Sequence, residues 1–148
     1  RKITGSVLNM AKTKIHANLK GNMAFEMNLD GHKLITDASE DIGGNNLGPR
    51  PKQLLLAGLI GCTGIDVMSI LKKMKVQLDD CVIKVEADNT EEHPRVYENI
   101  HLTYIFKGKN LSRRSLEKAV SLSQEKYCGV SAMLKKATSI TYDIIIEE

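Results

Sequence analysis

One uncharged stretch in the first half of the chain decides the fold: Gln53-Leu54-Leu55-Leu56-Ala57-Gly58-Leu59-Ile60-Gly61-Cys62-Thr63-Gly64-Ile65. It is too long for a strand and too short to span a bilayer, so it predicts a helix. Pro51 suits the first helical position. Lys72, Lys73 and Lys75 suit the last turns, where cations meet the negative end of the helix dipole. A helix that is apolar on nearly all sides is buried on nearly all sides, which places it at the centre of the fold.

Three glycines, Gly58, Gly61 and Gly64, recur along one flank of this helix. Each Gly costs a helix about 1 kcal/mol relative to Ala, so we expect another backbone to approach this flank closely. The helix is also too apolar for one thin sheet to cover. A second copy of the chain is therefore expected to cover the rest, as a homodimer.

The composition describes an ordinary soluble globular protein. A length of 148 residues fits one domain with a real core. The net charge of +3 is scattered and aromatic residues make up only 4%, which disfavours a nucleic-acid surface. No signal peptide or transmembrane run is visible, so no membrane association is expected. Three widely spaced cysteines without a CxxC pair indicate free thiols in a reducing compartment, and we expect a cytoplasmic protein.

Alternating and helical periodicities predict the order β-β-β-α-β-β-α-α-β. This order favours an α+β fold with mostly antiparallel sheets. Met10 looks like a natural start, so residues 1–11 are expected to be an N-terminal extension or a cloning remnant before a single domain, 12–148. The Asp-, Asn- and Gly-rich segment 37–50 has the composition of a mobile loop. The predicted strands cover 15–19, 23–29, 32–36, 82–87, 96–106 and 140–146, and the later helices start near 113 and 128.

The cysteines are the best candidates for reactive side chains in this sequence. A free Cys is nevertheless commonly just a small buried hydrophobic residue. Cys62 lies well inside its helix, where the dipole gives a thiolate little help. Cys128 follows Lys126 and a helix break, so its thiol could feel a positive field. Cys81 follows Asp79-Asp80, which should raise the pKa of its thiol, and a structural role is expected.

Two carboxylates stand one helical turn from these thiols. Asp66 follows Cys62, and Glu125 precedes Cys128. Asp66 could equally be a polar group satisfied by a partner chain or a helix end, and Glu125 a solvated surface position. The four histidines form no HxH or HxxxH pair, and no Cys/His cluster has zinc spacing, so neither a metal site nor a cofactor is expected. No phosphate loop or hydrolase elbow is present.

Two motifs closely resemble those of the OsmC/Ohr superfamily: Pro51-x-x-Leu54-Leu55-Leu56-Ala57-Gly58-Leu59-x-Gly61-Cys62 and Ser123-x-Glu125-Lys126-Tyr127-Cys128. The segments 65–67 and 92–96 look most like its YhfA-like subgroup. The resemblance covers about residues 12–148. It implies an intertwined homodimer in which sheets wrap two long central helices, with two active sites at the interface.

The same resemblance implies a function. Members of the Ohr and OsmC branches reduce organic hydroperoxides with thiol reductants. Carried over, Cys62 would be the peroxidatic thiolate and Cys128 the resolving thiol. The apolar helix around Cys62 would favour an organic hydroperoxide over hydrogen peroxide.

The sequence departs from the family at the groups that activate the thiolate. Lys52 stands where active branches have a Glu, and their N-terminal Arg has no counterpart between Arg1 and Arg50. Without a cation, a buried Cys62 would have a raised pKa and react slowly. Lys52 is the preferred substitute, with Arg50 next, from either subunit, and Arg95 a weaker candidate.

The leading hypothesis is thus a thiol-dependent peroxidase. The missing Arg–Glu pair keeps a second hypothesis open, a non-catalytic dimer that senses oxidation or binds a small hydrophobic ligand. A purely structural dimer with inert cysteines is the third.

Overall fold

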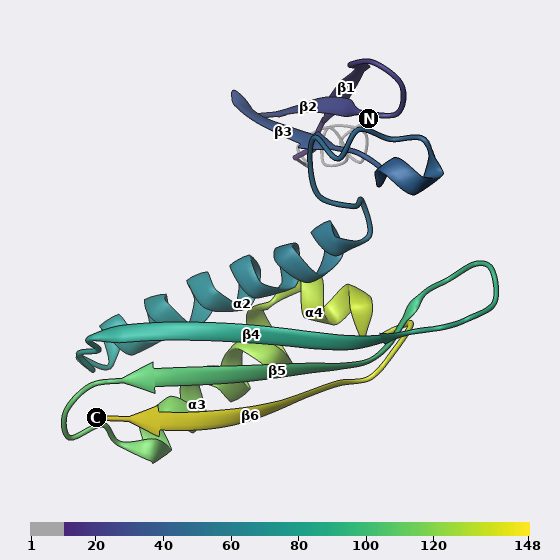
Figure 1. The fold of residues 1–148 in the computed structure, drawn as a ribbon. Helices are drawn as coiled ribbons and strands as arrows, with labels where there is room; N and C mark the ends of the chain where they lie inside the picture. Colours follow the sequence, from purple (N-terminus) through teal and green to yellow (C-terminus); the bar gives the residue numbers. More distant parts are fainter. Residues whose placement is uncertain (1–10) are drawn as a thin grey trace, which may run out of the picture. The chain divides into compact units, whose positions relative to one another are not determined.

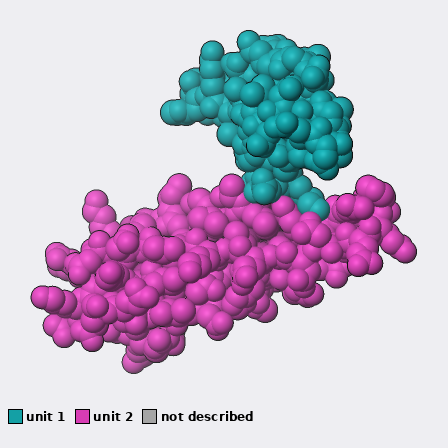
Figure 2. All heavy atoms as spheres, in the orientation of Figure 1, with its two compact units in different colours: residues 1–54 teal, residues 55–148 magenta. Residues whose placement is uncertain are grey.

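The computed structural model describes residues 11–148, so all of the expected extension, residues 1–11, except its last residue lies outside the described residues. The chain divides into two compact units, residues 1–54 and residues 55–148, coloured separately in Figure 2. Each unit has a three-stranded sheet of its own, and the element order confirms the predicted α+β class.

The first unit holds an antiparallel meander of β1 (His16–Leu19), β2 (Phe25–Leu29) and β3 (His32–Thr36). Leu19 lies opposite Phe25, so both side chains stand on the same face of the sheet. Leu19 is 58% exposed and Phe25 is 43% exposed. An apolar sheet face that remains this open needs a further surface to cover it.

The loop after β3 is more ordered than its composition indicates. It contains a short 3-10 helix, η1 (Glu40–Ile42), and it is organised by the buried side chain of Asp37. The backbone N–H groups of Ala38, Asn45 and Leu47 donate to the Asp37 carboxylate at 2.7–3.1 Å. One carboxylate therefore connects the two ends of the loop, and the mobility of this segment stays a prediction.

The second unit is built on a sheet of β4 (Asp80–Asn89), β5 (Tyr97–Lys107) and β6 (Ile140–Glu147), in that order. β4 pairs with β5 in antiparallel fashion, whereas β5 and β6 are parallel. A parallel pair needs a long crossover, which the helices between β5 and β6 provide. The prediction of mostly antiparallel sheets is confirmed, with this one parallel exception.

Helices cover one face of this sheet (Figure 1): α2 (Gln53–Lys73), α3 (Arg113–Leu122) and α4 (Gly129–Leu134). Between α3 and α4 lies a π-helical turn, η2 (Ser123–Tyr127). The inward face of β5 is fully buried against the helices, and the core contains Leu59, Val67, Leu71, Ile100, Leu102, Tyr104, Phe106, Leu116, Ala119 and Val120. Burying such side chains stabilises the unit by about 1.5–3 kcal/mol each.

The central helix α2 is buried on one side only. Leu59, Val67 and Leu71 enter the core, whereas Ile65 is 74% exposed and Leu55 is 50% exposed. By length and composition alone α2 could cross a membrane, but core helices of soluble proteins pass the same test. Leu59, Val67 and Leu71 belong to the same buried core as the inward face of β5, and the opposite side of α2 is apolar and uncovered.

The glycines of α2 do not meet a neighbouring backbone within the described residues. A Cβ at Gly58 or Gly61 would have nothing within 4 Å, and one at Gly64 would touch only the Ile83 side chain at 3.4 Å. Among residues 11–148 no backbone makes the expected close approach, which stays a prediction about a partner chain. Gly58 and Gly61 lie on the exposed part of the helix.

Candidate functional site

Three side chains from distant parts of the sequence converge in the second unit. The Sγ atoms of Cys62 and Cys128 and a carboxylate oxygen of Asp66 all lie within 4.8 Å of one another. Cys62 and Asp66 come from consecutive turns of α2, as their spacing predicts. Cys128 is brought to them by the crossover between β5 and β6.

The backbone around Cys128 is specialised for holding this thiol. The π-helical turn η2 ends at Cys128, which has an extended backbone and is the N-cap of α4. The Ser131 N–H donates to the Cys128 Sγ at 3.4 Å, so the thiol takes the place of a capping oxygen. Cys128 is only 3% exposed. The predicted helix break before Cys128 is confirmed, and π-turns of this kind often occur at functional sites.

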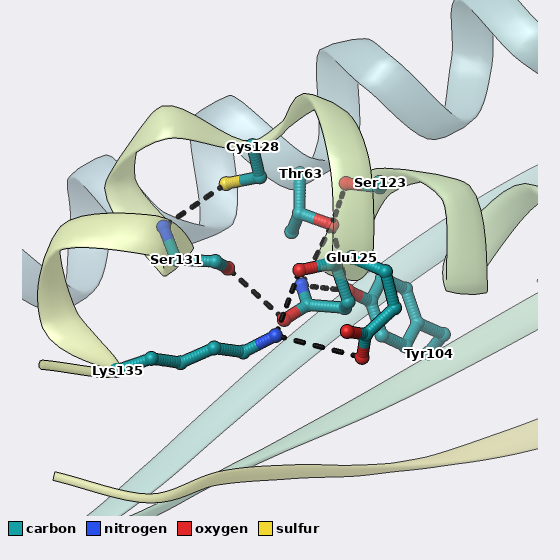
Figure 3. A network of polar contacts seen from close by, with 8 residues as sticks. Thr63, Tyr104, Ser123, Glu125, Cys128, Ser131 and Lys135 are labelled. Carbon is teal, nitrogen blue, oxygen red and sulfur yellow. Dashed lines mark hydrogen bonds and ion pairs between the residues drawn. The ribbon is translucent and has the colours of Figure 1, made fainter.

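A chain of hydroxyl groups, of which Figure 3 shows Tyr104, Thr63 and Ser123, connects the core to Asp66. The Ser123 hydroxyl donates to Asp66 Oδ2 at 3.0 Å, so its single proton is already used. Thr63 Oγ1, 2.8 Å from Ser123 Oγ, must then donate to Ser123. The Tyr104 hydroxyl, 2.7 Å from Thr63, must in turn donate to Thr63. All these protons point toward the Asp66 carboxylate.

Gln124 extends this network to the second cysteine. Its Nε2 donates to Thr63 Oγ1 at 3.2 Å and to the Tyr104 hydroxyl at 3.0 Å. Its Oε1 accepts from the Ser131 hydroxyl at 3.0 Å, and the Ser131 N–H contacts Cys128. Every buried side-chain nitrogen and oxygen among the described residues has a hydrogen-bond partner. The network therefore fixes the relative positions of the two thiols and Asp66.

The pKa of the Cys62 thiol is raised from its ordinary value. Burial is the main cause, a hydrogen bond with the Cys128 thiol and the nearby charge of Asp66 add to it, and the Val130 N–H partly opposes it. The sequence predicts this direction for a thiol without a neighbouring cation. Cys62 is thus held as the neutral thiol by its own unit.

The two predicted cations, Arg50 and Lys52, belong to the first unit, whereas both thiols belong to the second. The Arg50 guanidinium donates to the carbonyl oxygens of Asp37 at 3.2 Å and Gly48 at 2.9 Å. It also donates to the Asn46 side chain at 2.7 Å. Arg50 is therefore engaged in closing its own loop. Lys52 is half-buried and lines an apolar hollow of the first unit.

Two further side chains singled out by the sequence lie outside the cluster. Glu125 is 73% exposed and pairs with Lys135 at 3.6 Å, which fits a solvated surface position. The pKa of Cys81 is raised by burial and, to a lesser degree, by Asp80, as its acidic neighbours predict. The functional importance of Thr63, Ser123 and Gln124 escaped sequence reasoning, although Ser123 stands in the second motif.

A cavity of about 400 Å³ opens beside the cluster. Asp66 is part of its wall, and so is Tyr127, the residue before Cys128. The remaining lining is largely apolar and comes from α2 and the end of α3: Ile70, Met74, Leu122, Ser69 and Lys73. An apolar molecule in this cavity would lie next to the Asp66 carboxylate, which has an oxygen within 4.8 Å of both sulfurs.

Comparisons with known proteins agree on one family. The sequence pattern of the OsmC-like protein family matches residues 43–143. Protein YhfA of Escherichia coli K12 is 38% identical over 112 residues, which cover 76% of this chain and 81% of YhfA. A crystal structure of a hypothetical protein from Aquifex aeolicus VF5 is 32% identical and superimposes with a TM-score of 0.80, covering 94% of this chain and all of that one.

One structural neighbour has a name that states a function. It is an organic hydroperoxide resistance protein OsmC from Legionella pneumophila, described as a predicted redox protein. It is 19% identical, with a TM-score of 0.65 over 92% of this chain and 98% of that one. A structural similarity at 19% sequence identity shows only that the two proteins share a fold. The match over residues 43–143 and the identity to YhfA establish that this chain belongs to the OsmC-like protein family.

Proposed function

We propose that this protein reduces organic hydroperoxides with a thiol reductant, using Cys62 and Cys128 as a redox pair. The observation that carries the proposal is the proximity of the two Sγ atoms, which lie within 4.8 Å of each other and of Asp66. Membership of the OsmC-like family and the name of the Legionella neighbour support the same reaction.

The reaction balances with the groups at hand and a dithiol. The Cys62 thiolate attacks the outer oxygen of the hydroperoxide and breaks the O–O bond, which yields the alcohol and a Cys62 sulfenic acid. The Cys128 thiol then attacks the Cys62 sulfur and expels water, leaving a disulfide. A dithiol reductant returns both cysteines to thiols and is itself oxidised to a disulfide.

An apolar hydroperoxide is the substrate class that suits this site. The cavity beside Asp66 has apolar walls, including Ile70, Met74 and Leu122, and could hold the hydrocarbon part of a substrate. Hydrogen peroxide has no hydrocarbon part, so apolar walls would not increase its binding affinity. We therefore propose organic hydroperoxides as substrates, in a cytoplasmic protein.

A cation is still needed, because the second unit raises the pKa of Cys62. We propose that Lys52 supplies it, from the same or a partner subunit of a homodimer. The Arg50 guanidinium bonds to Asp37, Gly48 and Asn46 within its own loop. In Lys52→Met the pKa of Cys62 should rise further, and an unchanged pKa would remove Lys52 from the mechanism.

The homodimer itself is supported by two uncovered apolar surfaces. One is the exposed side of α2 with Leu55, Gly61 and Ile65, and the other is the sheet face with Leu19 and Phe25. A second copy of the chain could cover both apolar surfaces, because most soluble oligomers are symmetric homo-oligomers.

One observation favours a second function. Asp66 is an anion beside Cys62, and it disfavours the thiolate that rapid catalysis requires. A slowly reacting pair would act as a sensor that forms one disulfide and stops.

Turnover separates these two functions. We would measure consumption of cumene hydroperoxide with dithiothreitol in the wild type, Cys62→Ser and Cys128→Ser, with Cys81→Ser as the matched control. The peroxidase predicts many turnovers, lost in Cys62→Ser and retained in Cys81→Ser. One turnover or none, in a folded protein, supports the sensor and contradicts the peroxidase.

A further inference from the structure

We propose that Cys62, Cys128 and Asp66 form a binding site for a thiophilic divalent cation of the zinc class, which occupies the reduced thiol pair and blocks its oxidation. The two thiols and the carboxylate are ligand types that Zn²⁺ binds in proteins. The linear sequence does not reveal the site, because one ligand is separated from the other two by the whole β4–β5–α3 segment.

The distances suit a cation with little rearrangement. The three ligand atoms lie within 4.8 Å of one another. A point at the centre of a triangle with sides of 4.8 Å lies about 2.8 Å from each corner, whereas Zn–S bonds are about 2.3 Å long. Each sulfur therefore has to move inward by about 0.5 Å, and the carboxylate oxygen, whose bonds to zinc are about 2.0–2.2 Å long, by about 0.7 Å. Small side-chain rotations provide such movements. A water molecule can complete a tetrahedron.

The surroundings support the ligands from outside. Ser123 donates to Asp66 Oδ2 at 3.0 Å and so orients the carboxylate. The Ser131 N–H donates to the Cys128 sulfur at 3.4 Å, an interaction that a thiolate strengthens. Such supporting bonds commonly contribute a factor of about 10–100 to metal affinity.

Binding has a defined stoichiometry and consequence. One Zn²⁺ replaces the two thiol protons, which are released to solvent, and no electrons are transferred. Both sulfurs then carry a metal bond, so neither attacks a peroxide and no disulfide forms. The binding does not depend on peroxidase activity, whereas inhibition of turnover rests on the proposed function.

The test uses the reduced full-length chain without peroxide. Zn²⁺ is titrated in competition with a chromophoric chelator, and Cd²⁺ is added separately because thiolate–Cd²⁺ bonds absorb in the ultraviolet. The proposal predicts one tight ion per chain and a thiolate–Cd²⁺ band. Cys62→Ser and Cys128→Ser should each weaken binding by more than about 100-fold, because they remove a ligand rather than a supporting bond.

Two further variants distinguish ligation from a looser association. Asp66→Asn should weaken Zn²⁺ binding at least about tenfold, and Ser123→Ala about tenfold. Cys81→Ser, which removes a thiol outside the cluster, should leave the affinity unchanged.

Unchanged affinity in Cys62→Ser or in Asp66→Asn would overturn the site, as would a loss in Cys81→Ser. If the protein binds Zn²⁺ tightly but does not turn over hydroperoxide, the metal site stands and only the peroxidase is refuted. If it turns over hydroperoxide but does not bind Zn²⁺ tightly, the peroxidase stands and the metal site is refuted.

Discussion

The Ser123 hydroxyl donates a 3.0 Å hydrogen bond to Asp66 Oδ2 and thereby joins the π-helical turn before Cys128 to the helix that carries Cys62. Ser123 also bonds to Thr63, which bonds to Tyr104. The thiol pair therefore depends on a polar core, because apolar packing alone would not fix the distance between the two sulfurs.

Removing the charge of Asp66 should make Cys62 more acidic. The Asp66 carboxylate raises the pKa of the Cys62 thiol, so Asp66→Asn should lower that pKa, while the amide oxygen can still accept from Ser123. The pH dependence of Cys62 alkylation, followed by mass spectrometry of its peptide, measures the change. Asp143→Asn, at an exposed carboxylate paired with His101, is the control and should have no effect. A pKa that stays the same or rises in Asp66→Asn contradicts the assigned electrostatics.

Thr63→Val should destabilise the second unit without changing its shape. The Thr63 hydroxyl is buried and contacts Tyr104, Ser123 and Gln124, each of which would lose a partner. Leaving buried polar groups unsatisfied costs about 1–3 kcal/mol, which chemical denaturation would measure. Thr103→Val, outside the core cluster, is the control. Equal stability of the Thr63 variant and the wild type would show that the network is dispensable.

The loop of the first unit should loosen only in strong acid. Burial would raise the pKa of Asp37, but the N–H groups of Leu47, Ala38 and Asn45 and the charge of Arg50 outweigh it, so the pKa is lowered. A carboxyl with a lowered folded pKa stabilises the fold above its unfolded pKa of about 3.9 and loses that contribution as the pH falls through the folded value.

Hydrogen exchange at the Asn45 and Leu47 amides tests this sign. Their protection factors should remain constant down to about pH 4 and fall only below it. Asp37→Asn should lose protection at every pH. Loosening of the wild-type loop between pH 5 and 7 would contradict the role of Asp37.

The dimer proposal predicts a specific effect at Gly61. Among the residues that the structure describes, nothing lies within 4 Å of a Cβ at Gly61, so Gly61→Leu should leave the isolated chain folded. If a partner packs on this side of α2, overpacking costs about 1–3 kcal/mol and raises the dimer dissociation constant by about 5- to 150-fold. Sedimentation equilibrium measures it, with Lys118→Leu on α3 as the control. A wild-type monomer, or a dimer indifferent to Gly61→Leu, would refute the interface.

Periodicity alone predicted most of the elements, because each helix and strand has a regular apolar face. The central helix, the broken helix at Cys128 and the six strands all lie close to their predicted positions. The parallel pairing of β5 with β6 was not predictable, because sequence patterns describe which faces are buried and not which strand is the neighbour. The order of the loop around Asp37 escaped prediction for a related reason, since it depends on one carboxylate reaching three amides.

The candidate site was predictable only in part. The motifs identified Cys62 and Cys128, and helical spacing placed Asp66 beside Cys62. The hydroxyl chain from Tyr104 to Asp66 joins three elements that are distant in sequence, so no local pattern indicates it. The glycines of α2 predicted a close approach by another backbone; the described residues place none there, so this stays a prediction about a partner chain.

The most direct test of the redox pair is to treat the reduced protein with one equivalent of cumene hydroperoxide and map its cysteines by peptide mass spectrometry. The account predicts a peptide in which Cys62 and Cys128 of one chain are linked by a disulfide, while Cys81 remains a free thiol. Three free thiols, or a Cys62 oxidised to sulfinic acid without any link to Cys128, would contradict it.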